Sequence, residues 1–151
     1  MNVRLTVKGD KEIIRKLNLL DDLNKDAMEE TIKRVIELVR TDAEYNIRHG
    51  RPEWPPFKYK EGLGRFGGFE GLYRTGELAE SMKTTYLSQG NQTLGIVYSD
   101  VEHSVFHELG TTGFRAVPPR PFLWPAFIDN QDRIVEIAKE ETEKVARGAS
   151  R

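Results

Sequence analysis

The residues of this chain that could do chemistry begin with two histidines four positions apart, His103 and His107, with Glu108 beside the second. On a helix this spacing places both imidazole rings on one face. A small metal-dependent hydrolase could use such a trio, but a zinc site needs a further ligand and groups that orient the rings. His49 is the only other histidine, and the chain has no H-E-x-x-H pattern. We therefore favour histidines that pack or face solvent, and we expect no metal and no cofactor.

Two further patterns lack the context that their chemistry requires. Residues 62–67 match G-x-G-x-x-G, but a dinucleotide site needs a strand before the glycines and a helix after them, and here proline and more glycine surround the pattern. Ser81, Ser104 and Asp100 could form a catalytic triad with a histidine, but no G-x-S-x-G turn is present. We therefore predict a protein that is not an enzyme.

Composition favours one soluble domain. The chain has 151 residues, of which 38% are hydrophobic and 31% charged, with a net charge of −1 and no cysteine. Nothing in this balance favours nucleic acid as the main partner. No stretch approaches the roughly 18 apolar residues of a membrane span, and the first residues do not resemble a signal peptide. We expect a cytoplasmic protein that forms a single domain over residues 1–151.

The elements that must position these residues begin with alternating Val3, Leu5 and Val7, which predict a strand, followed by a short helix after Asp10. A long helix is predicted from about Asp26 to Arg48, because apolar residues recur at helical spacing. They are Met28, Ile32, Val35, Ile36, Val39, Ala43 and Ile47. Gly50 and Pro52 end this helix.

Residues 49–74 predict a long glycine- and proline-rich loop, which is uncommon in compact domains unless it is functional or disordered. The loop also carries aromatic side chains, which are costly to leave in water and could cover another subunit. We assign it to partner binding and predict that residues 55–71 are mobile in the isolated protein. The aromatic residues are Trp54, Phe57, Tyr59, Phe66, Phe69 and Tyr73.

The second half predicts a short helix, a hairpin and a long helix. Thr75 can cap a helix to about Met82 that buries Leu78 and Met82, and two strands, 83–88 and 93–99, flank a turn. Prolines forbid a regular helix between Val117 and about Trp124, after which Pro125 can begin a helix to about Ala146. The fold class is therefore α+β, with a small, mostly antiparallel sheet packed against two long helices.

Three segments in this order resemble the tail-completion or head–tail joining proteins of tailed phages, including the Mu-type virion morphogenesis family. Residues 72–82 (LYRTGELAESM) are similar to L-x-x-T-G-x-L-x-x-S-I, and residues 105–111 (VFHELGT) to the end of Y-A-x-x-H-E-F-G-T. Residues 117–126 (VPPRPFLWPA) are similar to I-P-A-R-P-F-L-x-P-A, and the Trp54-Pro55 step also fits the Mu-type pattern. The resemblance covers roughly residues 54–127.

The resemblance implies a phage structural protein that assembles into a ring, most plausibly a hexamer, where the head joins the tail. Its partners would be copies of itself and other head-connector and tail proteins, first in the host cytoplasm and then in the virion. A tail terminator or another minor tail protein remains an alternative, as does the metal-dependent hydrolase. The matched residues with expected structural roles are Thr75, Gly76, Leu78, His107, Glu108, Gly110, Pro121, Phe122 and Leu123.

The roles of Gly110 and of Arg120, which we count among the candidate partner-binding residues, have physical reasons. Gly110 is expected to adopt a left-handed conformation, which side chains resist. Arg120 lies between two prolines that fix its path, so its guanidinium suits a bidentate partner. That partner could be a carboxylate of a neighbouring subunit, but we favour Glu108 of the same chain.

Overall fold

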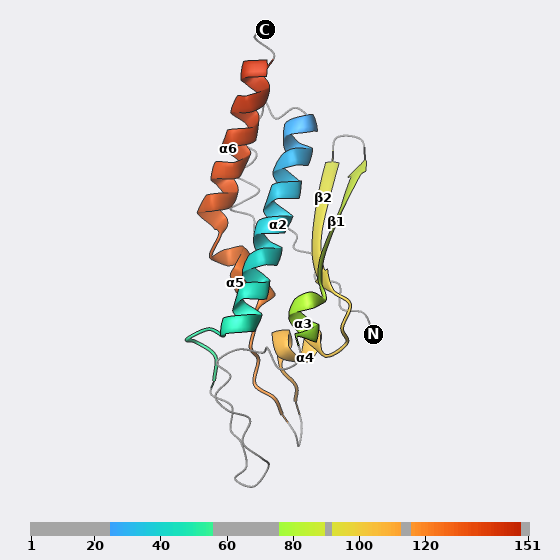
Figure 1. Cartoon of the computed structure of the whole chain (residues 1–151), viewed down its shortest axis with the longest axis vertical. Coiled ribbons are helices and arrows are strands. Elements are labelled where there is room, and N and C mark those ends of the chain that lie inside the picture. The colour runs from blue at the N-terminus through green and yellow to red at the C-terminus, as the bar shows by residue number, and fades with distance from the viewer. Residues whose placement is uncertain (1–24, 56–75, 90–91, 113–115, 149–151) are drawn as a thin grey trace.

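The computed structural model describes residues 25–55, 76–89, 92–112 and 116–148, and within them the fold is α+β. Helix α2 (Lys25–His49) is the centre of the molecule, with α6 (Gln131–Gly148) along one side and an antiparallel hairpin along the other (Figure 1). The hairpin consists of β1 (Met82–Gln89) and β2 (Gln92–Ser99). The described residues confirm the α+β class, the two long helices and the antiparallel sheet, but the sheet packs against α2, whereas α6 lies on the other side of α2.

The apolar stripe of α2 forms most of its packing face, as predicted. Val39, Ala43 and Ile47 are buried, and Ile32 and Val35 are packed against the core. A helix of 25 residues is about 37 Å long, which lets one helix contact α6, both strands, α3 and α5. It ends at Gly50, whose positive φ of 75° allows its N–H to bond to the Asn46 carbonyl.

The hairpin presses closely on α2. The pairing runs from Met82 opposite Ser99 to Gln89 opposite Gln92, which agrees with the predicted strands and turn. A Cβ atom added to Gly95 would lie only 2.4 Å from Cγ2 of Ile36 and 2.7 Å from Cγ2 of Ile32. Glycine at this position therefore lets the strand approach the helix.

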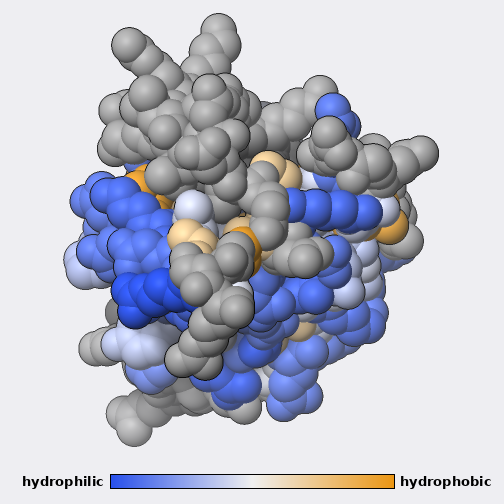
Figure 2. All heavy atoms as spheres, turned by 90° about the horizontal axis from the view of Figure 1, so that it is seen from above, coloured by the Kyte–Doolittle hydropathy of each residue, from blue (hydrophilic) through white to orange (hydrophobic). Residues whose placement is uncertain are grey.

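The short elements lie toward one end of the molecule. They are α3 (Glu77–Glu80), α4 (Ser104–Leu109) and α5 (Leu123–Ile128). The predicted helix from Thr75 to Met82 is shorter than expected, because Met82 already belongs to β1. At the other end, where α2 begins and α6 ends, the described surface is mainly hydrophilic (Figure 2).

The single helix predicted from Pro125 to Ala146 is wrong, since α5 and α6 are separated at Asp129 and Asn130. The N–H of Asp129 bonds to the Pro125 carbonyl, and the side-chain amide of Asn130 donates to the Ala126 carbonyl. Asp and Asn compete for backbone hydrogen bonds and so favour helix ends. No helix in the described residues is long and apolar enough to cross a bilayer.

Candidate functional site

Glu108 forms the centre of the candidate site. Its Oε2 accepts hydrogen bonds from the backbone N–H groups of Phe122 (2.8 Å) and Leu123 (3.0 Å), and its Oε1 accepts one from Trp124 (2.9 Å). These N–H groups belong to the start of α5, where a helix leaves its donors without intrahelical partners. The buried carboxylate therefore caps α5 from another helix, and its charge is favourable at that helix N-terminus.

Gly110 lets the chain turn back so that this cap can form. Its backbone has φ 73° and ψ −178°, a region that is essentially restricted to glycine. A Cβ atom there would lie 2.8 Å from the Val117 carbonyl oxygen and 2.9 Å from the Pro119 nitrogen. The Thr111 N–H donates to the Val117 carbonyl (2.9 Å), and the Thr111 hydroxyl accepts from the Val117 N–H (2.8 Å). The prediction of a positive φ at Gly110 is confirmed.

The side chain of Arg120 is buried within the subunit. It is only 3% exposed, its backbone N–H donates to the His107 carbonyl (2.7 Å), and its Nη2 donates to the Pro55 carbonyl (2.9 Å). Among the described residues the favoured ion pair between Arg120 and Glu108 is not formed, and the Glu108 carboxylate accepts three backbone N–H groups. A role of Arg120 in binding a partner stays a prediction.

Trp54 and Asn46 attach residues 117–124, which we call the proline segment, to the first half of the chain. The indole N–H of Trp54 donates to the Pro121 carbonyl (3.1 Å), and its ring packs against the core. The buried side-chain amide of Asn46 donates to the Phe122 carbonyl (3.0 Å). The sequence analysis missed Asn46, although a polar residue beside the apolar stripe of a helix was an available signal.

The second and third of the segments with phage-like motifs meet here, and the described part of the first, residues 76–82, reaches the strand that precedes them. The first contributes Gly76, with φ 84° before α3, and the buried residues Leu78 and Ser81. The Ser81 hydroxyl lies 2.7 Å from that of Ser99, which accepts the N–H of Val101 just before α4. The second and third segments are joined by Glu108. We call α4, Gly110, residues 116–124 and Trp54 the motif junction.

The core anchors the motif junction through Phe122 and Leu123, which are 2% and 5% exposed and belong to the main hydrophobic cluster. Pro121, between Arg120 and these anchors, is half-buried. The recess beside them has a volume of about 20 Å³ and is lined by Tyr98, Ser99, Ser104, Val105, Glu108, Phe122 and Leu123. That volume is enough for about one water molecule and too small for an organic substrate.

The two histidines of α4 meet edge to face, with ring centroids 5.8 Å apart. Desolvation, the nearby His103 and the Arg120 guanidinium together hold the pKa of His107 below its ordinary value of 6.5. Among the described residues no group of three or more His, Cys, Asp or Glu side chains could hold a metal ion. Glu108, one of the three residues of the hydrolase alternative, is directed at the amides of α5 instead.

Apolar side chains are exposed around the motif junction. The charged residues in stretches 104–112 and 116–124, Glu108 and Arg120, are both buried, so these stretches expose no Asp, Glu, Lys or Arg side chain. Half of the eight large hydrophobic residues that are exposed in the described chain lie here, and we call them the junction surface: Phe106, Leu109, Val117 and Trp124.

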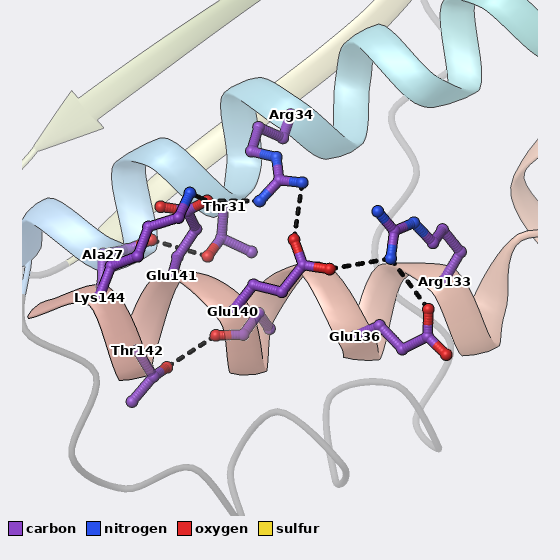
Figure 3. Close-up of polar contacts among 10 residues, drawn as sticks. Ala27, Thr31, Arg34, Arg133, Glu136, Glu140, Glu141, Thr142 and Lys144 are labelled. Atoms are coloured by element: carbon purple, nitrogen blue, oxygen red, sulfur yellow. Dashed lines mark hydrogen bonds and ion pairs between the residues drawn. The ribbon is translucent and has the colours of Figure 1, made fainter. Parts of the chain in front are cut away.

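A second polar cluster joins α2 to α6 (Figure 3). Arg34 on α2 forms ion pairs with Glu140 (2.8 Å) and Glu141, and Lys144 reaches Glu141 at 2.6 Å. The hydrogen bond from Lys144 and that from Arg34 lower the pKa of Glu141 against the opposing effect of desolvation. The sequence analysis missed this cluster, because Glu141 looks like one more charge in an alternating run and yet is buried.

Several predicted site residues lie outside the described residues. They include Thr75, the glycines of 62–67, and four of the aromatic residues assigned to partner binding: Phe57, Tyr59, Phe66 and Phe69. Residues 55–71, which are predicted to be mobile, also lie outside the described residues, except for Pro55.

Comparisons of the chain with protein-family models, curated proteins and solved structures found no match.

Proposed function

We propose that this chain is a structural subunit of a tailed phage or prophage that assembles with copies of itself into a ring at the head–tail joint. The observation that carries the proposal is the joining of two family-like segments, residues 105–111 and 117–126, by the three hydrogen bonds of Glu108. Glu108, Gly110 and Phe122 have roles there in holding backbone together. A subunit that acts by assembling needs a surface of fixed shape, and residues that hold the backbone in place provide it.

The junction surface is the part of the described chain best suited to contact a second copy. It combines exposed apolar side chains with the absence of exposed Asp, Glu, Lys and Arg from the described stretches 104–112 and 116–124, in a protein with 31% charged residues. Depletion of charge at an apolar centre is the compositional sign of a protein–protein interface. The cap by Glu108 and the turn at Gly110 fix the backbone below this surface, which lowers the entropy cost of association.

The test is the mass of the purified full chain over a range of concentrations, by light scattering and native mass spectrometry, with electron microscopy of any assembly. A closed oligomer of defined number, most plausibly six, is expected. The double variant Phe106→Ser/Leu109→Ser should shift the mass to that of a monomer without lowering the melting temperature.

Leu87→Ser on β1 is the matched control, because Leu87 is 61% exposed and Leu109 is 66% exposed. It should assemble like the original protein. If Leu87→Ser alone prevented assembly, the contact between subunits would lie on the hairpin and not on the junction surface. A chain that stays monomeric at all concentrations, and does not form rings with its tail partners, would overturn the proposal.

A further inference from the structure

His107 occupies an unusual position for a titratable group. Its backbone carbonyl accepts the N–H of Arg120, so it sits on the seam between α4 and the proline segment. Its ring is half-buried, and within the part of the chain that the structure describes its Nδ1 atom is buried without a hydrogen-bond partner. No role for this ring follows from the proposed function.

The surroundings of the ring favour its neutral form. A neutral imidazole can keep a bare lone pair on Nδ1 and carry its proton on Nε2, whereas the protonated ring donates from both nitrogens. Protonation would therefore place a buried N–H on Nδ1 where no acceptor is available, and an unsatisfied buried donor is costly.

The charges around His107 act in the same direction. His103 on the same helix and Arg120 on the docked segment are both repulsive to a protonated ring, and both contribute to the depressed pKa after desolvation. The neighbouring carboxylate, Glu108, is held by the amides of Phe122, Leu123 and Trp124. The ring is thus enclosed by groups that oppose its positive charge.

We propose that His107 is a proton-operated switch that releases the proline segment from α4 in mildly acidic solution. The neutral ring is compatible with the docked segment, and the protonated ring is not. Docking is therefore at full strength above pH 6.5 and weakens as the pH falls from 6.5 toward the lower pKa of the folded state, below which it weakens no further. The switch belongs to the isolated chain and does not depend on the assembly role.

The two tryptophans of the chain provide a local probe, because both lie in the motif junction. Trp54 is hydrogen-bonded to the Pro121 carbonyl, and the backbone N–H of Trp124 is bound by Glu108. Tryptophan fluorescence of the full chain should change with a midpoint below pH 6.5, while the helical circular dichroism at 222 nm stays constant. Simultaneous loss of both signals would mean global unfolding and would overturn a local switch.

Variants of all three histidines identify the group that titrates. His107→Gln should abolish the fluorescence transition, and His49→Gln, whose ring stacks on Tyr45, should leave it unchanged. His103→Gln should move the midpoint to higher pH, because a repulsive neighbour is removed. A transition that persists in His107→Gln belongs to another group, such as a carboxyl, and would overturn the proposal.

A measurement on the unmodified chain covers the case in which His107→Gln does not fold. Nuclear magnetic resonance follows the ring nitrogens of His107 through the titration. A proton on Nε2 at pH 7.5 and a titration midpoint below 6.5 are expected. A midpoint at or above 6.5 would contradict the switch.

Discussion

At the scale of single residues, Glu108 acts as a helix cap supplied from a distance of 14 positions. Local caps use Ser, Thr, Asp or Asn next to the helix, but the residue before α5 is Phe122, which forms no side-chain cap. The proline segment is therefore held at its end by a carboxylate from α4. A Glu next to a His can therefore resemble a catalytic pair in the sequence, although its carboxylate binds backbone N–H groups in the structure.

Removing the Glu108 carboxylate should destabilise the fold. Glu108→Ala leaves three N–H groups without their acceptor, and we expect a loss of about 2–4 kcal/mol in the free energy of unfolding. Glu108→Gln keeps one oxygen and should lose less. Urea denaturation measures both, with the exposed Glu136→Ala as a control that should change by less than about 0.5 kcal/mol. Equal stability of Glu108→Ala and the original protein would show that water replaces the carboxylate at no cost.

The backbone at Gly110 gives a second prediction at this scale. Gly110→Ala places a side chain in a glycine-only conformation and against the backbone of Val117 and Pro119, so it should cost at least 1–3 kcal/mol, roughly. Gly148→Ala is the matched control, because nothing lies within 4 Å of its Cβ position. The control should be neutral or slightly stabilising in thermal denaturation. Similar melting temperatures for the two variants would contradict the turn described for Gly110.

At the scale of elements, α2 separates two different kinds of contact. Toward the hairpin the contact is mainly apolar and close, with a hydrogen bond from Thr84 to Glu37 at its exposed edge, and toward α6 it includes the buried Glu141 with Arg34 and Lys144. A close apolar contact fixes distance, whereas a charged contact depends on pH. The two sides of α2 should therefore respond to different perturbations.

The hairpin side should respond to volume. Gly95→Ala introduces a methyl group into the space of the Ile36 side chain, and overpacking of this kind costs about 1–3 kcal/mol. Ile36→Ala removes the obstructing Cγ2 atom at a cavity cost of its own. In a double-mutant cycle the combined variant should be more stable than the sum of the single losses. Strict additivity would mean that the strand moves away from α2 freely.

The α6 side should respond to acid. The pKa of Glu141 is lowered in the folded state, so its contribution to stability is present above its ordinary value of 4.5 and is lost as the pH falls through the folded pKa. Glu141→Gln should therefore lose less stability than the original protein between about pH 5 and pH 3. Chemical denaturation at a series of pH values gives both curves, and parallel curves would exclude Glu141 from the acid response.

At the scale of the whole molecule, every main contact between described elements includes α2, except the pairing of β1 with β2. Amide exchange should therefore be slowest in its buried middle, around Val39 and Ala43. The outer half of the hairpin, where Tyr86, Leu87 and Leu94 are exposed, should exchange faster. Exchange in the hairpin as slow as in α2 would indicate a single cooperative unit with no weaker part.

The sequence was informative where one physical rule dominates. Helical spacing of apolar residues located α2, and alternation with a polar turn located the hairpin. The same rules failed at Asp129–Asn130, because apolar periodicity continues across the break.

The candidate site was harder to predict, because its bonds join side chains to backbone far along the chain. Residue types can indicate that Glu108, Gly110 and Arg120 matter. They do not reveal which carbonyl or N–H each one reaches, since that depends on how the proline segment folds back. His107 was considered as a metal ligand or a packing residue, but its position beside Arg120 appears only in three dimensions.

The three hydrogen bonds of Glu108 end on main-chain N–H groups, which every amino acid except proline carries. Substitutions at positions 122–124 can therefore preserve these bonds, whereas Glu108 itself cannot be replaced without losing them, and Gly110 cannot gain a Cβ. During evolution the sequence of the motif junction would diverge at most positions, but it would retain an acidic residue two positions before a glycine. Distant relatives of this chain should then be recognisable by that spacing long after their sequence identity has disappeared.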